Sequence, residues 1–216
     1  MDFFNALILL LNYIFVPALA YGSQLAIGAI FVTLIYGILR FANFATGDMM
    51  SFGTMVAILF TWYFQSIGLS LGFLPTALLA IPFAILFMGL YMLIIDKFVF
   101  KYYRLNKSPP VQLAMVSIGV MFVTQAVVRI IIGPSDRRFF DGEKFLIKAN
   151  EFKEMTGLNE GLAIKSTQVI TIVVTIILVS TLFWFLNKTK TGKSMRAYSD
   201  NEDLALLSGI DPKKIV

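Results

Sequence analysis

The chain has 216 residues, of which 58% are hydrophobic and only 14% are charged, and its formal net charge is +5. An average soluble domain has about 25% charged residues, so this composition indicates an integral membrane protein. Because the sequence contains no Cys and no His, it excludes disulfides, thiolate or imidazole metal sites, and nucleophilic catalysis by either residue.

The excess of basic residues does not point to nucleic acid. These residues stand next to hydrophobic segments, where loop placement and anionic lipid explain them more simply. We therefore expect membrane lipid, and no nucleic acid, as a partner. The N-terminus has Asp2 and no Lys or Arg before a long apolar run, so it lacks the basic region of a cleavable signal peptide, and we expect the first helix to be retained.

Long uncharged runs predict an all-α fold, a polytopic bundle of transmembrane helices. A bilayer core about 30 Å thick needs about 20 apolar residues per helix, which predicts about five or six spans here. Lipid offers no partner to free backbone groups, and the alternation typical of barrel strands is absent from the sequence. The runs are Phe3–Leu39, Met49–Ile95, Val111–Val128 and Ser166–Asn187.

The first run is too long for one span, and Pro17 and the pair Tyr21-Gly22 interrupt it. It divides into segments over Phe3–Ala20 and Gly22–Leu39. These segments form either a tight hairpin or one kinked span that an interfacial helix precedes. The residues alone leave both arrangements open.

The second run divides at Gly68–Gly72, where glycines indicate a turn. We expect a transmembrane helical domain over residues 1–187 and a cytoplasmic segment over 188–216. Within the first, residues 133–165 form an external loop with a short helix near Asn150–Thr156. The later spans are expected over Met49–Ile67, about Phe73–Ile95, Val111–Ile132 and Ser166–Asn187.

Lys and Arg near the span ends predict the orientation. One basic cluster follows the span that ends at Ile95 and a second follows the last span. Two spans separate the clusters, so both lie on one side, which should be the cytoplasm. Residues 133–165 also contain basic residues, but in a loop of this length basic residues have less influence on the orientation. The first cluster is Lys97, Lys101, Arg104 and Lys107, the second is Lys188, Lys190, Lys193 and Arg196, and the loop has Arg137, Arg138, Lys144, Lys148 and Lys153.

Between residues 3 and 95 the only charges are Arg40 and Asp48, and both lie in the stretch RFANFATGD, residues 40–48. A charge inside lipid costs about 2.5–3.5 kcal/mol on insertion scales and is kept mainly where it serves a pathway or a fold. Asp48 with Gly47 could cap a helix that begins at Met49. Alternatively, the stretch is a discontinuous helix that lines a substrate path.

Asn43 distinguishes these two interpretations, because it lies too far from Met49 to cap a helix that begins there. If the stretch lines a substrate path, its candidate path residues are Asn43, Thr46, Gly47 and Asp48. Gln24, a polar residue within a span, is a further candidate. Other polar side chains in the spans, such as Ser23 and Thr124, could line the same cavity. More often such side chains bond to a neighbouring helix, and the small residues Ala29, Thr33 and Gly37 favour close helix packing.

The C-terminal segment predicts a short helix. Asp200 or Asn201 can cap a helix through Leu207, and Gly209 can end it in a left-handed conformation, with Pro212 beyond. The apolar residues from Leu204 to Leu207 would suit docking into a groove on a soluble partner.

Several of these motifs resemble the permease subunits of branched-chain amino-acid ABC importers. The resemblance covers nearly the whole chain in register. It is most specific in RFANFATGD and in GKSMRA followed by LLSGI. Its parts are Gly22-Ser23, Thr33 through YGILRFANFATGD, Ser117-Ile118-Gly119-Val120, Gly133-Pro134, TKTGKSMRA and LALLSGI.

The resemblance implies a permease subunit of the bacterial inner membrane that moves branched-chain or related amino acids. It implies two cytoplasmic ATPases, a second permease subunit and a periplasmic substrate-binding protein as partners. ATP is then bound by the partner subunits, since this chain has no Gly-rich phosphate loop. We expect no catalytic residue, metal or cofactor in the chain itself.

The family's coupling loop has the pattern Glu-Ala-Ala, three residues, Gly. Here Asp203, Leu204, Ala205 and Gly209 occupy that pattern, with Asp in place of Glu and Leu in place of Ala. Thr46 stands where the family often has His. Similar permeases continue past the coupling loop with further membrane helices, so the resemblance implies that C-terminal helices are missing after Val216.

Three alternatives remain open from the sequence. A permease of a urea or short-amide importer shares the resemblance and differs only in substrate. An ion channel or secondary transporter is a second alternative, although the spans lack paired acidic residues for ion coupling. A membrane scaffold that transports nothing is the third, and it would need no coupling loop.

Overall fold

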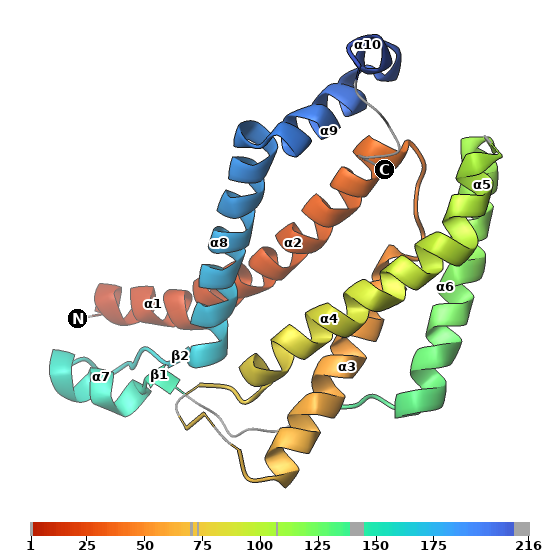
Figure 1. Ribbon diagram of the computed structural model, residues 1–216. Coiled ribbons are helices and arrows are strands. Elements are labelled where there is room, and N and C mark those ends of the chain that lie inside the picture. Colours follow the sequence, from red (N-terminus) through yellow and green to blue (C-terminus); the bar gives the residue numbers. More distant parts are fainter. Residues whose placement is uncertain (1, 70, 73, 107, 139–144, 210–216) are drawn as a thin grey trace. The chain divides into compact units, whose positions relative to one another are not determined.

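The computed structural model describes residues 2–69, 71–72, 74–106, 108–138 and 145–209. Most of these residues are helical, and the chain divides into two compact units (Figure 1). The first unit is Met1–Leu39 with Glu143–Val216, and the second is Arg40–Gly142. Phe73, Lys107, Lys144 and Pro212, which figure in the sequence analysis, lie outside the described residues, and so does the side chain of Asp203.

The second unit is built around one central helix. Helix α3 packs against both α4 and α6, and its buried positions include Met49, Gly53 and Thr61. A side chain at Gly53 would place its Cβ 2.8 Å from the sulfur of Met88 on α4, so glycine permits this close approach. The helices are α3 (Thr46–Ser66), α4 (Ala77–Ile95), the π-helical η2 (Asp96–Phe100), α5 (Lys101–Leu105) and α6 (Pro110–Ile132).

The expected turn between the two spans of the second run is confirmed. Helix α3 ends at Ser66, and Gly68 and Gly72 follow with φ angles of 79° and 57°. Glycine populates this left-handed region without steric cost, which explains why the chain reverses here.

The first unit contains the two ends of the chain. Its helices are α1 (Asp2–Leu10), the π-helical η1 (Leu11–Phe15), α2 (Val16–Leu39), α7 (Ala149–Thr156), α8 (Ser166–Lys188), α9 (Lys190–Asp200) and α10 (Glu202–Leu207). Strands β1 (Phe145–Ile147) and β2 (Ile164–Lys165) pair antiparallel. Helix α7 confirms the short helix expected near Asn150–Thr156, whereas the strand pair was not expected.

The N-terminal run does not form a hairpin. The chain is helical from Asp2 to Leu39, with no turn at Tyr21-Gly22. The interruption lies earlier, at η1, where the Val16 N–H bonds to the Leu11 carbonyl. Pro17 has no N–H to offer the preceding turn, which favours a local π-helical adjustment. In Figure 1, α1 and α2 run in different directions on either side of η1, so the hairpin is wrong and the run is one bent helix.

Helices α2 and α8 pack side by side and run in the same direction (Figure 1). Near their beginnings, the side chain of Asn12 accepts a hydrogen bond from the Ala163 N–H at 3.3 Å. Near their ends, Leu34 and Ile38 line the same pocket as Leu186. The beginnings of the two helices therefore lie together, and so do their ends, which means that the helices are parallel.

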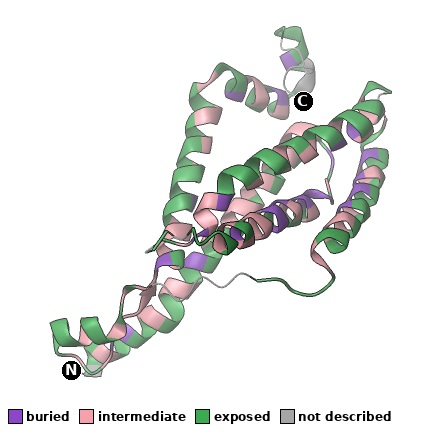
Figure 2. Cartoon of the chain, turned by 60° about the horizontal axis from the view of Figure 1, so that its bottom comes forward, coloured by how far each residue is buried: buried purple, intermediate pink, exposed green. Residues whose placement is uncertain are grey.

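Among the described residues, four helices are long and apolar enough to cross a membrane: Phe3–Leu39, Ala77–Leu105, Pro110–Ile132 and Ser166–Lys188. This is fewer than the five or six spans expected. One reason is that the N-terminal run is a single helix. The other is that α3 is less apolar, because its contacts with α4 and α6 place Thr46 and Thr61 in the protein interior. Much of the remaining apolar surface is exposed, as a membrane protein requires (Figure 2).

Candidate functional site

The stretch RFANFATGD breaks the helix differently from the sequence expectation. Arg40 follows α2 with a φ of 58°, and among the described residues it is the one non-glycine residue with a positive φ. Helix α3 then begins at Thr46 rather than at Met49. Asp48 therefore lies inside the first helical turn, and the prediction that it caps the helix is wrong. A carboxylate in that turn still interacts favourably with the helix dipole.

Asn43 organises the start of α3. Its side-chain oxygen accepts the Ala45 N–H at 3.1 Å, and its carbonyl accepts the hydroxyl of Thr46 at 2.8 Å. An Asx turn of this kind satisfies the backbone just before a helix. The expectation that Asn43 lies too far away for a structural role is therefore wrong. Its amide nitrogen makes none of the hydrogen bonds found within the described residues.

Two contacts with buried side chains tie residues 41–45 to other helices of the same unit. The Phe44 N–H donates to the hydroxyl of Ser117 on α6 at 3.1 Å, and that hydroxyl donates to the Ala114 carbonyl at 2.7 Å. Ser117 is fully buried. The ring of Phe41 lies 6.0 Å from the ring of Phe100 in η2, and both side chains are buried. The break is thus fixed in place by α6 and η2.

Ser117 is the functional candidate that the sequence analysis did not single out. It was noted within the motif Ser117-Ile118-Gly119-Val120, but without a role. A buried hydroxyl on an apolar helix must find a partner, and this rule marks Ser117 as bonded. The rule does not say that the partner is Phe44, 73 positions away in the chain.

The structure places the candidate path residues in two groups. Asn43 and Thr46 contact each other, Thr46 is buried, Asp48 is half-buried, and Gly47 is exposed with open space where a Cβ would lie. Gln24 is exposed on α2, which belongs to the other unit. The role of all five residues in a substrate path stays a prediction.

Polar groups elsewhere in the second unit hold helices together. The buried hydroxyl of Thr124 on α6 bonds to the Val120 carbonyl at 2.8 Å and to the hydroxyl of Tyr91 on α4 at 2.9 Å. The ring of Tyr91 also stacks on Phe52 of α3, with ring centres 4.1 Å apart. For Thr124 the helix-packing interpretation therefore explains the contacts.

A second candidate region, which we call the arm, comprises residues 189–209. It begins with Thr189, whose hydroxyl donates to the Phe185 carbonyl at 2.7 Å and accepts the Gly192 N–H at 3.0 Å. The Thr189 side chain thus bonds to the C-terminal end of α8 and caps the N-terminus of α9. Any Cβ at Gly192 would collide with the Phe185 carbonyl and lie 2.7 Å from the Leu186 Cα. Only glycine allows this sharp approach.

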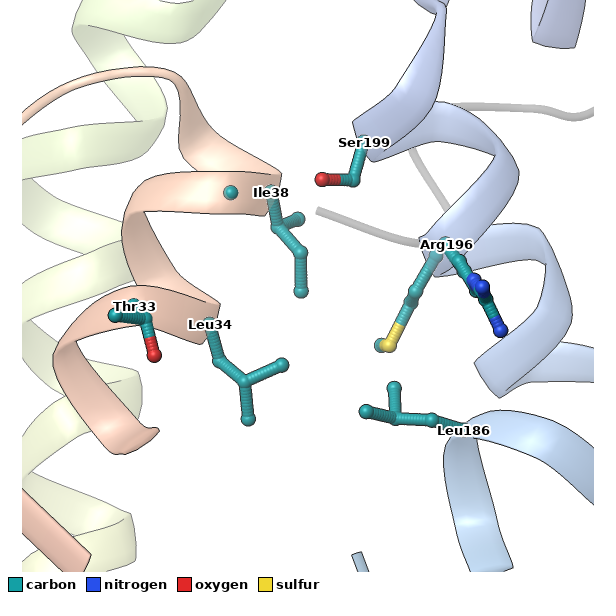
Figure 3. Close-up of a pocket in the computed structure, with 8 residues that line it drawn as sticks. Thr33, Leu34, Ile38, Leu186, Arg196 and Ser199 are labelled. Atoms are coloured by element: carbon teal, nitrogen blue, oxygen red, sulfur yellow. The ribbon is translucent and has the colours of Figure 1, made fainter. Parts of the chain in front are cut away.

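The arm packs back on α2 within the first unit. Gly37 of α2 lies against Ser199 of α9, because a Cβ at Gly37 would be 3.1 Å from the Ser199 hydroxyl. A pocket of about 190 Å³ lies alongside, with Leu34 and Ile38 on one side and Leu186 and Arg196 on the other (Figure 3). The small residue at position 37 therefore serves close helix packing, as the sequence pattern indicated.

The arm ends in the expected short helix. Asn201 caps α10 by accepting the Leu204 N–H at 3.1 Å, and Gly209 has a φ of 78° just beyond the helix. Both features confirm the sequence prediction. Ala205 is buried, whereas Leu204 is 60% and Leu207 is 85% exposed. Exposed leucines on a short, well-capped helix leave an apolar surface for a partner.

Comparison with known proteins identifies the family. A family model described as the permease component of the branched-chain amino acid transport system matches residues 14–216. The chain belongs to this family. Two relatives are the high-affinity branched-chain amino acid transport system permease proteins LivH of Escherichia coli and of Salmonella typhimurium. Each is 25% identical over 199 residues, which is 90% of this chain and 61% of the relative.

The family confirms the resemblance seen in the sequence and the interpretation as a mostly helical, multi-pass membrane protein of a transport permease class. The chain spans about 61% of the length of the relatives it matches. No solved structure matches the chain. Within the described residues, no group of three or more acidic side chains is placed to hold a metal ion.

Proposed function

We propose that the chain forms the membrane-spanning core of a permease subunit in an ABC importer for branched-chain or related small amino acids. It pairs with a second permease subunit, two cytoplasmic ATPases bind and hydrolyse ATP, and a periplasmic binding protein delivers the substrate. The assembly resides in the bacterial inner membrane. The family and the LivH relatives support this proposal.

The observation that carries the proposal is the arm. Its helix α10 follows the last span, begins at a side-chain cap, ends at a left-handed glycine and exposes Leu204 and Leu207. This arrangement suits docking into a groove of a soluble subunit. Asp203, Leu204, Ala205 and Gly209 are the residues that we assign to ATPase coupling, which moves the spans between outward and inward access.

The parallel packing of α2 and α8 supports a topology with an additional crossing. If α2, α4, α6 and α8 were the spans, α2 and α8 would point in opposite directions, because two spans would separate them. They point in the same direction, which supports an odd number of spans between them. Helix α3, with 21 residues and about 30 Å of length, is long enough to be the third.

This topology places the basic clusters after α4 and α8, together with the arm, in the cytoplasm and residues 145–165 outside. The chain has no native cysteine, so single cysteines at positions 101, 138 and 193 test it directly. We expect a membrane-impermeant thiol reagent added to intact cells to label position 138 alone. Labelling at position 193 from outside would contradict the orientation.

Uptake by the assembled transporter tests the function itself. Cells that express the permease with its ATPases and binding protein should accumulate labelled leucine, isoleucine or valine and should lose uptake when the ATPases are inactivated. Excess urea should not compete. Competition by urea alone would identify the short-amide alternative, and uptake that persists without the ATPases would identify a channel or secondary transporter.

A further inference from the structure

The N-terminal helix is longer than one membrane crossing. The apolar helix Phe3–Leu39 has 37 residues and at 1.5 Å per residue would extend about 55 Å, against a hydrocarbon core of about 30 Å. Helix α2 alone, with 24 residues, extends about 36 Å and suffices for the crossing. The segment of α1 and η1 before the bend is therefore surplus to the span.

One face of this segment is hydrogen-bonded to the loop residues that precede α8. The Asn5 side chain accepts the Glu160 N–H at 3.4 Å, and the Asn12 side chain accepts the Ala163 N–H at 3.3 Å. Ile8 lies between them and is buried. The spacing of Asn5, Ile8 and Asn12 places all three on one side of a helix. This side is occupied by a segment that lies just before the start of span α8.

The opposite face is apolar, aromatic and exposed. Phe3 is 76% exposed, Leu7, Leu10 and Ile14 on the same side are also exposed, and Tyr13 at its edge is 73% exposed. No Lys or Arg occurs in the segment. Aromatic side chains are enriched at the level of the lipid headgroups, where an amphipathic helix lies with its apolar face in the membrane.

We propose that α1 with η1 lies in the membrane interface and holds residues 160–163 against the bilayer surface through Asn5 and Asn12. The occupant of the apolar face is lipid. Three observations favour lipid as the occupant: the length beyond one crossing, the exposed aromatic face, and the hydrogen bonds to residues 160–163 just before α8. The segment is a positioning device for the loop over residues 145–165, and it is independent of which substrate is carried.

Spin labels on single cysteines test the depth of α1 in the assembled transporter, reconstituted in phosphatidylethanolamine–phosphatidylglycerol vesicles. Labels replacing Phe3, Leu7 and Leu10 on the apolar face should share one shallow depth, with access to oxygen. Labels replacing Leu25 and Val32 on α2 serve as controls and should differ in depth by the helical rise. A steady increase in label depth from position 3 to position 10, about 10 Å in total, would overturn the proposal, because it would mean that α1 crosses the membrane. Free access of a water-soluble nickel chelate would also overturn it, because the face would then lie in water. Access of neither oxygen nor the chelate would overturn it as well, because a protein partner would then cover the face.

A second measurement tests the hold on the loop. A label replacing Asn159, which is exposed, should become more mobile when Asn5 and Asn12 are both changed to Ala. Asn187→Ala is the matched control, because Asn187 bonds to Arg196 at the other end of α8 and should leave the label unchanged. An immobile label in the double variant would contradict the anchoring. Neither readout depends on transport, so failure here is distinguishable from failure of the proposed function.

Discussion

Two interruptions between helices differ in how the protein holds them. Residues 40–45, before α3, are tied to distant helices by the Phe44–Ser117 hydrogen bond and the contact between Phe41 and Phe100. The arm, residues 189–209, is shaped by contacts close in sequence: Thr189 with Phe185 and Gly192, and Asn201 with Leu204. The first is set by tertiary packing, and the second mainly by local caps.

This difference has a mechanical consequence. A segment fixed by buried contacts with other helices can shift only if those helices repack. The arm keeps its internal shape through its own caps, so it can move as a body on the end of α8 once the packing of α9 against α2 yields. An element that passes ATPase motion to the spans must be able to move as a body without changing shape. A wall of a substrate path must instead be held rigidly by neighbouring helices. Substitutions in residues 40–45 and in the arm separate the two properties.

The largest effect is expected at the start of the arm. In Gly192→Val the new side chain collides with the backbone at Phe185 and Leu186, and backbone yields less readily than a flexible side chain. The cost should reach about 3 kcal/mol or more and displace the whole arm. We expect the permease to insert and to lose ATPase-coupled uptake. Gly28→Ala, where a Cβ meets open space, is the control. Normal uptake in Gly192→Val would show that the arm's direction is unimportant.

Ser117→Ala probes the tertiary side of the comparison. The variant leaves the Phe44 N–H without its buried acceptor, which costs about 1–3 kcal/mol. Both protein level and uptake per molecule should fall, because the segment before α3 loses its attachment to α6. Ser117→Thr keeps the hydroxyl and should recover part of the loss. Ser51→Ala removes a hydroxyl bonded only within α3 and should be neutral. If Ser117→Ala behaved like Ser51→Ala, the segment would not depend on α6.

The same contrast explains what the sequence could predict. The bounds of α6, α7 and α8, the cap at Asn201 and the left-handed Gly209 were predictable, because apolar runs and capping residues are local signals. The start of α3 was missed because Asn43 acts through an Asx turn two residues ahead. The partner of Ser117 was missed because no local pattern encodes a contact between α6 and Phe44.

The position of the bend in the N-terminal run was missed for a different reason. Tyr21-Gly22 was a plausible turn, yet glycine is tolerated inside apolar helices and the chain continues through it as α2. The π-helical segment η1 has no simple sequence signal apart from the nearby Pro17. The strand pair β1–β2 is too short for its alternation to be recognised.

Gly209→Val tests the local end of the arm. A β-branched residue resists the left-handed conformation at φ 78°, at a cost of about 1–2 kcal/mol. We expect normal insertion, a misplaced α10 and reduced substrate-stimulated ATPase activity in the assembled transporter. Gly89→Ala, where a Cβ inside α4 meets open space, provides the control. Undiminished ATPase stimulation in Gly209→Val would argue against the coupling assignment.

Asn43 separates a structural from a path role. Asn43→Ala removes the Asx turn and should cost about 1 kcal/mol, whereas Asn43→Ser retains a weaker turn through its hydroxyl. Neither variant has the amide nitrogen. If the side chain only organises the helix start, Asn43→Ser should restore both protein level and uptake. Uptake per molecule that stays low in both variants, at normal protein level in Asn43→Ser, would place the amide in the path.

The smallest effect is expected at Asp48, inside the first turn of α3. Asp48→Asn removes a charge that complements the positive end of the helix, at a cost of about 0.3–1 kcal/mol. Among the described residues Asp48 has no ion-pair partner, so the variant should leave no opposite charge unpaired. Uptake should then fall only in proportion to protein level, which quantitative immunoblotting of membranes measures beside transport. A loss of uptake per molecule beyond a few-fold exceeds what the helix dipole explains. It would assign the half-buried carboxylate to the substrate path and make the break before α3 a functional element.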